Sequence, residues 1–185
     1  MTLKGLVGGS DVFLAKYSAD GAHMWSTRFG GSGDQWGTSV KTDSAGNVVL
    51  VGFLSGVGSI DLGGGAIASP NGSNSFAAKF DPLGAHLWSK GFGDQSGALA
   101  YDLTVDGAGN AIVTGQFTGT LDLDSGPLTS AGDSDIFVAN TTVANFFRAF
   151  AGSRSRQLAD RGCCGGSKDS GAASLRRHGP SPGER

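Results

Sequence analysis

Cysteine is almost absent from this sequence of 185 residues, and its two copies, Cys163 and Cys164, are adjacent near the end. Before residue 140 there is therefore no disulfide framework, which fits an exported protein without disulfides and a cytosolic protein equally well. No apolar run reaches the roughly 18 residues that a membrane-spanning helix needs, so no membrane span is expected. Residues 1–9 also lack the apolar core of a signal peptide.

Glutamate and arginine are also scarce before residue 140, and this scarcity divides the chain. Residues 1–139 hold six Lys and Arg, only one of them Arg, against thirteen Asp and no Glu, for a formal charge of −7. Residues 140–185 hold eight Lys and Arg, seven of them Arg, against three acids, for a charge of +5. The basic end thus reflects a change of composition rather than a basic patch on one fold, and no nucleic-acid partner is predicted.

Charged residues make up only 16% of the chain while glycine contributes 33 residues, which disfavours a helical bundle and favours a turn-rich β-protein. This β-rich part repeats itself at a period of about 62 residues. The motif S-D-V-F-L-A-K-Y at 10–17 returns as S-N-S-F-A-A-K-F at 73–80 and as S-D-I-F-V-A-N at 134–140. G-A-H-M-W-S at 21–26 returns as G-A-H-L-W-S at 84–89, and D-S-A-G-N at 43–47 returns as D-G-A-G-N at 106–110.

Each repeat is interpreted as four short strands joined by turns. Side chains alternate between the faces of a strand, so Phe13 and Tyr17 share one face and Leu14 lies on the other. Apolar residues on both faces are typical of a sheet stacked between two others. Gly-Asn at 46–47 and 109–110 favours hairpin tips, because Gly and Asn tolerate positive φ. Four-stranded units at a fixed spacing predict the blades of a β-propeller.

In combination these motifs resemble the SBBP-type bacterial β-propeller repeat family over about residues 9–139. The resemblance implies an all-β fold, a partial β-propeller with about two four-stranded antiparallel blades. It also implies a bacterial cell-surface or secreted parent protein, because such repeats are common in large exported proteins. The family shares no catalytic residues, so the resemblance implies a fold and no reaction.

The pattern stops after Ala139, where Asn140 replaces the expected Lys. The expected organisation is a repeat region at 1–139, with repeats at about 10–72 and 73–133 and the start of a third at 134, and a basic tail at 140–185. The tail is expected to be irregular or weakly helical, with a candidate short helix at 143–151. It is interpreted as out-of-frame translation of a GC-rich gene, with a natural disordered tail as the alternative.

A β-propeller closes with about 4 to 8 blades, and closure removes exposed sheet edges. Two blades cannot close, so the chain is interpreted as a truncated or frameshifted fragment. Its strand edges and apolar blade faces are expected to be exposed, which favours aggregation or dependence on partner chains.

No catalytic, cofactor-binding or metal-binding residue is predicted, and no cofactor. His23 and His86 recur at one repeat position, which favours a structural role over a metal site. Asp122, Asp124 and Gly126 resemble part of a calcium loop, but the earlier copy lacks the second acid, which favours a turn. The remaining candidates are assigned to turns (Asp34, Asp43, Asp94, Asp106 and the glycine runs at 30–33 and 63–65), to unpaired thiols (Cys163, Cys164) or to the tail (His178).

The function expected from the sequence is a non-catalytic binding or scaffold segment. Trp36 and Tyr101 depart from the repeat on the strand expected to line the propeller axis, and aromatic departures favour binding over catalysis. The alternative is a fragment of a propeller enzyme whose active site lies outside this chain. The expected partners are an unknown protein or carbohydrate ligand of the parent, with self-association through open blade faces, and the resemblance places the parent outside the cell or at its surface.

Overall fold

The computed structural model describes residues 9–70, 72–93, 97–123 and 126–141, and the backbone of 148–152. Within these residues the chain is all-β, as predicted, and no helix is long and apolar enough to span a membrane. The strands are β1 (Val12–Tyr17), β2 (His23–Phe29), β3 (Asp34–Thr42), β4 (Val48–Ser55), β5 (Gly58–Asp61), β6 (Ala66–Ser69), β7 (Asn74–Phe80), β8 (His86–Phe92), β9 (Ala98–Val105), β10 (Ala111–Phe117), β11 (Thr120–Asp122), β12 (Pro127–Thr129), β13 (Asp135–Asn140) and β14 (Arg148–Gly152).

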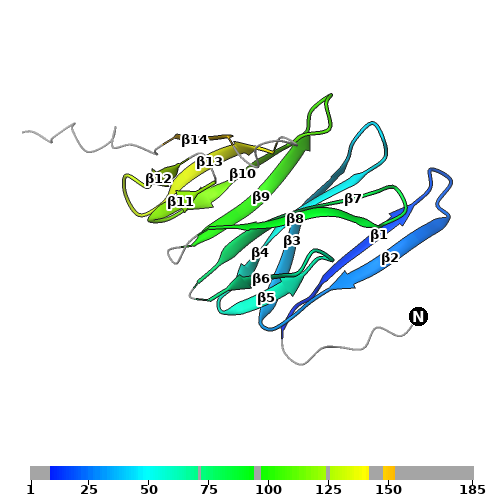
Figure 1. Cartoon of the computed structure of the whole chain (residues 1–185), viewed down its shortest axis with the longest axis horizontal. Coiled ribbons are helices and arrows are strands. Elements are labelled where there is room, and N and C mark those ends of the chain that lie inside the picture. The colour runs from blue at the N-terminus through cyan, green and yellow to red at the C-terminus, as the bar shows by residue number, and fades with distance from the viewer. Residues whose placement is uncertain (1–8, 71, 94–96, 124–125, 142–147, 153–185) are drawn as a thin grey trace, which may run out of the picture. The chain divides into compact units, whose positions relative to one another are not determined.

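Three antiparallel sheets follow one another along the chain (Figure 1). They are the N-terminal pair, β1–β2, the middle sheet, ordered β3–β4–β7–β8, and the last sheet, ordered β9–β10–β13–β14. A separate two-stranded hairpin joins the second and third strands of each four-stranded sheet, β5–β6 in the middle sheet and β11–β12 in the last. Two four-stranded antiparallel units of the same order make this a partial β-propeller-like fold, the predicted class.

Each four-stranded sheet takes its strands from two successive sequence repeats. In the middle sheet, β3 and β4 come from the repeat at 10–72, whereas β7 and β8 come from the repeat at 73–133. β1 and β2 pair with each other and do not join β3 and β4, so the interpretation of one sequence repeat as one four-stranded unit is wrong in its grouping of strands. The physical reason is that a tandem repeat has the same period wherever its start is placed, and period alone does not mark the edge of a sheet.

The Gly-Asn turns form at the ends of β3 and β9, as predicted. The Asp43 carboxylate accepts hydrogen bonds from the backbone N–H groups of Ala45 and Asn47, at 3.0 and 2.9 Å, and Gly46 has a φ of 80°. The turn at 106–110 repeats these bonds, and its glycine has a φ of 81°. An Asp that closes the turn and a Gly that accepts positive φ explain why this five-residue motif recurs.

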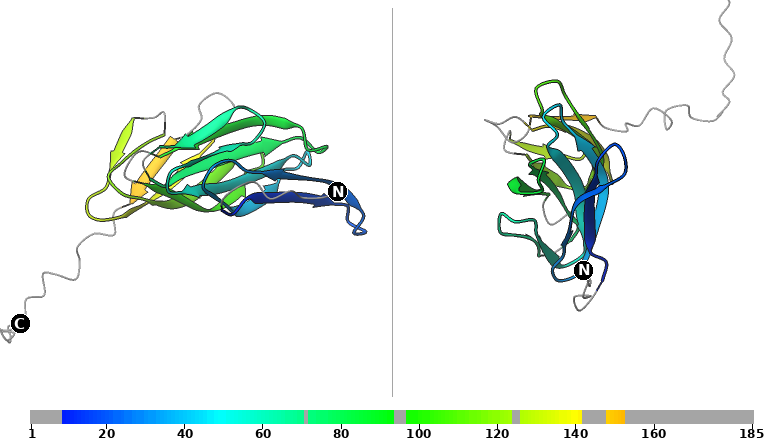
Figure 2. Two further views of the ribbon diagram at one scale, coloured as in Figure 1. Left: turned by 90° about the horizontal axis from the view of Figure 1, so that it is seen from below. Right: turned by 90° about the vertical axis from the view of Figure 1, so that its right-hand side faces the viewer.

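The core lies between the sheets, and the middle sheet is buried on both faces. In β4, Val48 and Leu50 face the N-terminal pair, whereas Val49 and Val51 face the last sheet, and all four are buried. Figure 2 shows the N-terminal pair (blue) and the end of the last sheet (yellow) toward opposite ends of the described strands, consistent with these two clusters. The apolar residues on both faces of β4 are therefore explained by stacking. The sequence made this prediction for β1, from Phe13, Tyr17 and Leu14, and there it is wrong for one face, since Phe13 and Tyr17 are exposed.

The tail contributes a strand where the sequence suggested a helix. Residues 148–152 form β14, which pairs with β13 from Ile136 opposite Gly152 to Asn140 opposite Arg148. The helix expected at 143–151 is therefore wrong from residue 148 onward, and residues 142–147 lie outside the described part. The free edge of β13 offers backbone donors and acceptors regardless of side chain, so a segment without the repeat motif can still complete the sheet.

Candidate functional site

The two repeated histidines lie in different surroundings. His23, in β2, is exposed, and the centroid of its ring lies 5.6 Å from that of the Tyr17 ring. His86, in β8, lies 3.0 Å from the Ser89 hydroxyl and contacts the Phe80 ring edge-on. Within the described part of the chain, no group of three His, Cys, Asp or Glu side chains is placed to hold a metal ion. Asp94, Asp124, Cys163, Cys164 and His178 lie outside the described residues.

Three of the described acidic residues that were assigned to turns, Asp34, Asp43 and Asp106, accept hydrogen bonds from backbone groups. Asp34 accepts from the N–H of Ser10 at 2.7 Å and so ties β3 to the start of β1. Asp61 accepts from the N–H groups of Gly63 and Gly65, at 2.8 and 3.2 Å, and so shapes the β5–β6 turn. These contacts, with those of Asp43 and the 106–110 turn, show that these carboxylates shape turns and strand ends.

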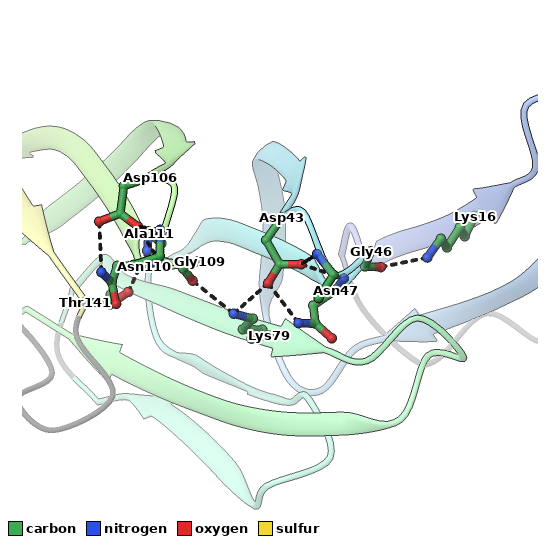
Figure 3. A network of polar contacts seen from close by, with 12 residues as sticks. Lys16, Asp43, Gly46, Asn47, Lys79, Asp106, Gly109, Asn110, Ala111 and Thr141 are labelled. Atoms are coloured by element: carbon green, nitrogen blue, oxygen red, sulfur yellow. Dashed lines mark hydrogen bonds and ion pairs between the residues drawn. The ribbon is translucent and has the colours of Figure 1, made fainter.

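A lysine at the end of each F-x-A-K motif bridges neighbouring sheets (Figure 3). The Lys16 ammonium donates to the Gly46 carbonyl at 2.7 Å, and the Lys79 ammonium donates to the Gly109 carbonyl at 2.9 Å. Each bond therefore links a strand to the Gly-Asn turn 30 residues ahead, in the next sheet. This bridge was not predicted from the motif, although the equal Lys-to-Gly spacing in both repeats was the available signal.

Lys79 makes a second contact within its own sheet, an ion pair with Asp43 at 2.9 Å. Burial by itself would raise the pKa of Asp43, but hydrogen bonds from Lys79 and Asn47 outweigh it and lower the pKa to about 2. Asp43 is therefore ionised near neutral pH, which suits a structural contact and not a proton donor.

At the third copy of the motif, Asn140 occupies the lysine position. Its side chain carries a buried oxygen, Oδ1, that has no hydrogen-bond partner among the described residues. Asp106, which corresponds to Asp43, accepts a hydrogen bond from the Asn110 amide at 2.8 Å, as Asp43 does from Asn47. Lysine therefore bridges neighbouring sheets at the first two copies of the motif, and the third copy, with Asn140, has no lysine to do so.

The edge strands β3 and β9 carry the two aromatic residues that depart from the repeat. Trp36 is 49% exposed and Tyr101 is 45% exposed. Both strands contain a β-bulge, between Gly37 and Ser39 in β3 and opposite Thr114–Gly115 in β9, where Tyr101 is the unpaired residue. Bulges redirect side chains and are common next to functional sites, so the local backbone explains how Tyr101 is presented.

Polar contacts fix these two edge strands to each other. The Ser39 hydroxyl donates to the Asp102 carboxylate at 2.7 Å, and the Thr38 hydroxyl donates to the Ala100 carbonyl at 2.9 Å. The Ser39 bond, a second bond from the Leu103 N–H and the charge of Lys41 lower the pKa of Asp102. The strand pair therefore presents aromatic side chains on a braced frame with an ionised carboxylate.

A shallow hollow of about 340 Å³ lies beside Tyr101, on the face of the last sheet that points away from the middle sheet. Thr114, Gln116, Ser134 and Ile136 also line it. The described lining residues offer hydroxyl, amide and apolar groups, which suit contact with a ligand surface.

Comparisons with known proteins bear on the repeat. No family model matches the chain. It is similar to an uncharacterized WD repeat-containing protein of Acanthamoeba polyphaga mimivirus, with 22% identity over 117 residues. The match covers 60% of this chain and only 8% of that protein. WD repeats are four-stranded blades of β-propellers, the unit that the middle and last sheets share. The chain is a β-propeller-like repeat protein.

This propeller-like repeat protein exposes an apolar face at each end of its stack of described sheets. On β1, Phe13 is 55% exposed and Tyr17 is 58% exposed, whereas their counterparts on β7, Phe76 and Phe80, are buried. At the other end, Ile136 and Val138 of β13 are exposed. Exposed blade faces were predicted, and they follow from having a neighbouring sheet on one side only.

Proposed function

We propose that this segment is a non-catalytic binding scaffold that holds a protein partner at the edge strands β3 and β9. The observation that carries the proposal is the pair of half-exposed aromatic residues, Trp36 and Tyr101, on two neighbouring strand edges. Large aromatic side chains dominate the binding energy of protein interfaces when a rigid frame presents them. A protein partner is favoured over a carbohydrate because a strand edge offers backbone donors and acceptors to an added peptide strand.

The polar groups at this edge support binding rather than catalysis. The Ser39 hydroxyl donates a hydrogen bond to the Asp102 carboxylate. Neither β3 nor β9 carries a histidine that would activate Ser39 as a nucleophile. Hydrogen bonds stabilise the ionised form of Asp102, so it is matched to a cationic or N–H group of a partner. Lys41, on the same strand as Trp36, supplies the opposite charge.

A peptide library displayed on phage tests this proposal when it is selected on the purified chain. Enriched peptides are then measured by fluorescence polarisation against the unmodified chain, Trp36→Ala and Tyr101→Ala. We expect each substitution to weaken binding at least about tenfold, the loss typical of a buried aromatic anchor. Leu83→Ala is the matched control, because Leu83 is an exposed apolar residue outside both strands. The proposal would be contradicted if both aromatic substitutions left the affinity of the enriched peptides unchanged, or if the selection enriched no peptide.

The proposal extends to location: the motif resemblance supports a parent protein that is secreted or displayed on a bacterial cell surface. An antibody raised against the chain, used on intact cells of the source organism, tests this directly. We expect external protease to remove the antigen from intact cells or the antigen to collect in the medium. Antigen that resists protease until the cells are lysed would reject an external location.

A further inference from the structure

The N-terminal pair has the register of half of a four-stranded sheet. In β1–β2, Lys16 lies opposite Trp25 and Tyr17 opposite His23. In β7–β8, Lys79 lies opposite Trp88 and Phe80 opposite His86, with the register shift at the same place. The two pairs differ on the outer side: β7 also pairs with β4, whereas β1 pairs with β2 alone among the described residues.

The side chains of β1 match a face that a neighbouring strand covers in the middle sheet. Phe76, the counterpart of Phe13, is buried beside Gly52 of β4, which has no room for a side chain. A Cβ atom added to Gly52 would lie 2.5 Å from the Phe76 ring and 2.0 Å from the Trp36 carbonyl oxygen. Phe13 is thus placed to cover a strand that has glycine at the facing position.

Lys16 shares one of the two contacts that Lys79 makes. Both reach the Gly-Asn turn of the next sheet, but Lys79 also forms an ion pair with Asp43 in the turn of its own sheet. Among the described residues, no ion pair is found for Lys16, whose other contact is the Pro82 carbonyl at 3.2 Å. An aspartate in the turn of an added hairpin would meet this ammonium as Asp43 meets Lys79.

We infer that the free edge of β1 is an acceptor site for a β-hairpin of the β3–β4 type, supplied by a further repeat unit of the same pattern. The middle sheet sets its register: Val48 would lie opposite Tyr17, Leu50 opposite Ala15 and Gly52 opposite Phe13. The hairpins β3–β4 and β9–β10 of this chain are already paired with β7 and β13, so the occupant is an additional hairpin. The inference concerns β1 and does not rest on the proposed function of β3 and β9.

A duplication tests this acceptor site within the whole chain. A second copy of residues 34–72 is joined directly to Ser10 in place of residues 1–9, which reproduces the order found before Ser73. Hydrogen exchange followed by mass spectrometry is then compared with that of the unmodified chain. We expect exchange in residues 12–17 to slow at least about tenfold, because the edge amides gain partners.

Two changes within the added copy serve as matched controls. Gly52→Val should abolish the protection of β1, since its side chain would collide with Phe13 and with the backbone of the copy's own first strand. Asp43→Asn should weaken it, since the ion pair to Lys16 is lost. Protection that survives both changes, or an unchanged β1 beside a folded copy, would overturn the inference.

A synthetic peptide of residues 34–55 gives an answer even if the duplicated chain does not fold. The peptide is labelled with a fluorophore and titrated against the unmodified chain, with anisotropy as the readout. We expect saturable binding that is lost with Phe13→Asp in the chain or Gly52→Val in the peptide, and kept with Trp36→Ala in the chain. No binding, or equal binding to the Phe13→Asp chain, would overturn the inference; loss with Trp36→Ala would place the peptide at β3 and overturn it as well.

Discussion

The middle and last sheets share one strand order and one set of motifs, yet the same strand position is buried differently in each. Val51 of β4 is fully buried against the last sheet, whereas Thr114, 63 residues later in β10, is exposed. The middle sheet has a neighbour on both faces, and the last sheet has one among the described residues. The comparison teaches that a strand in this fold is buried when a neighbouring sheet stacks on it. The strand's own sequence does not decide whether such a neighbour is present.

The two sheets also differ in how their turns are fixed. In the middle sheet, Lys79 joins Asp43 to the next Gly-Asn turn, whereas in the last sheet the buried oxygen of Asn140 has no partner among the described residues. Among the described residues, Lys79 combines an ion pair in its own sheet with a bond to the next sheet, whereas Lys16 makes only the bond to the next sheet. The four predictions below test whether these two differences have the consequences that the geometry implies.

The largest effect is expected when a charge is placed at the aligned positions Val51 and Thr114. Val51→Asp buries a carboxylate between two sheets and should destabilise the fold by about 4 kcal/mol or more, or prevent folding. Thr114→Asp places the charge on the open face, where it loses the hydroxyl bond to Phe137 and lies opposite Asp102, and should cost only about 1–2 kcal/mol. Urea unfolding followed by circular dichroism measures both. Equal losses would contradict the burial difference between the sheets.

The next effect concerns the lysine bridge. Lys79→Met removes the partner of a carboxylate whose side chain is only 4% exposed, and should cost about 2–4 kcal/mol. Lys16→Met removes hydrogen bonds to two carbonyl groups and no ion pair, and should cost about 1–2 kcal/mol. The same urea titration ranks the two variants. A larger loss for Lys16→Met would show that the ion pair with Asp43 contributes nothing.

These contacts separate what the sequence could predict from what it could not. The period, the strands and the turns at 43–47 and 106–110 follow from local chemistry, because alternation and Gly-Asn pairs act within a few residues. The grouping of β4 with β7 could not be predicted, since a repeat carries no mark of its phase. The strand β14 could not be predicted either, because it forms by backbone pairing with the edge of β13 and carries no repeat motif of its own.

The candidate surface divides in the same way. Trp36 and Tyr101 were singled out because they break the repeat, and both lie on exposed edge strands. The bridge from Lys79 to Gly109 was missed, because it joins residues 30 positions apart whose types are each common at turns and strand ends. The bulge that presents Tyr101 also depends on the pairing with β10, which a single strand does not reveal.

Acid should weaken the middle sheet through Asp43. Its pKa in the folded protein is about 2, below its unfolded value of about 4, so its stabilisation is complete above pH 4 and is lost as the pH falls through 2. The loss is at most about 2 kcal/mol. Urea unfolding of the unmodified chain and Asp43→Asn between pH 5 and pH 2 isolates this residue. The difference in unfolding free energy should shrink toward low pH; a constant difference would show that Asp43 does not titrate as the geometry implies.

The smallest effect is expected when the missing lysine is restored to the last sheet. Asn140→Lys removes a buried oxygen that has no partner among the described residues, and it places an ammonium where Lys79 meets Asp43, close to Asp106. The melting temperature should rise, but by less than Lys79→Met lowers it, because no Gly-Asn turn of a following sheet is present among the described residues to accept the second bond. Asn140→Met is the matched control, since it also removes the unpaired oxygen and adds no charge. If both variants rise equally, the gain comes from losing the orphaned oxygen; if Asn140→Lys alone rises, the bridge that distinguishes the two sheets can be transferred by one residue.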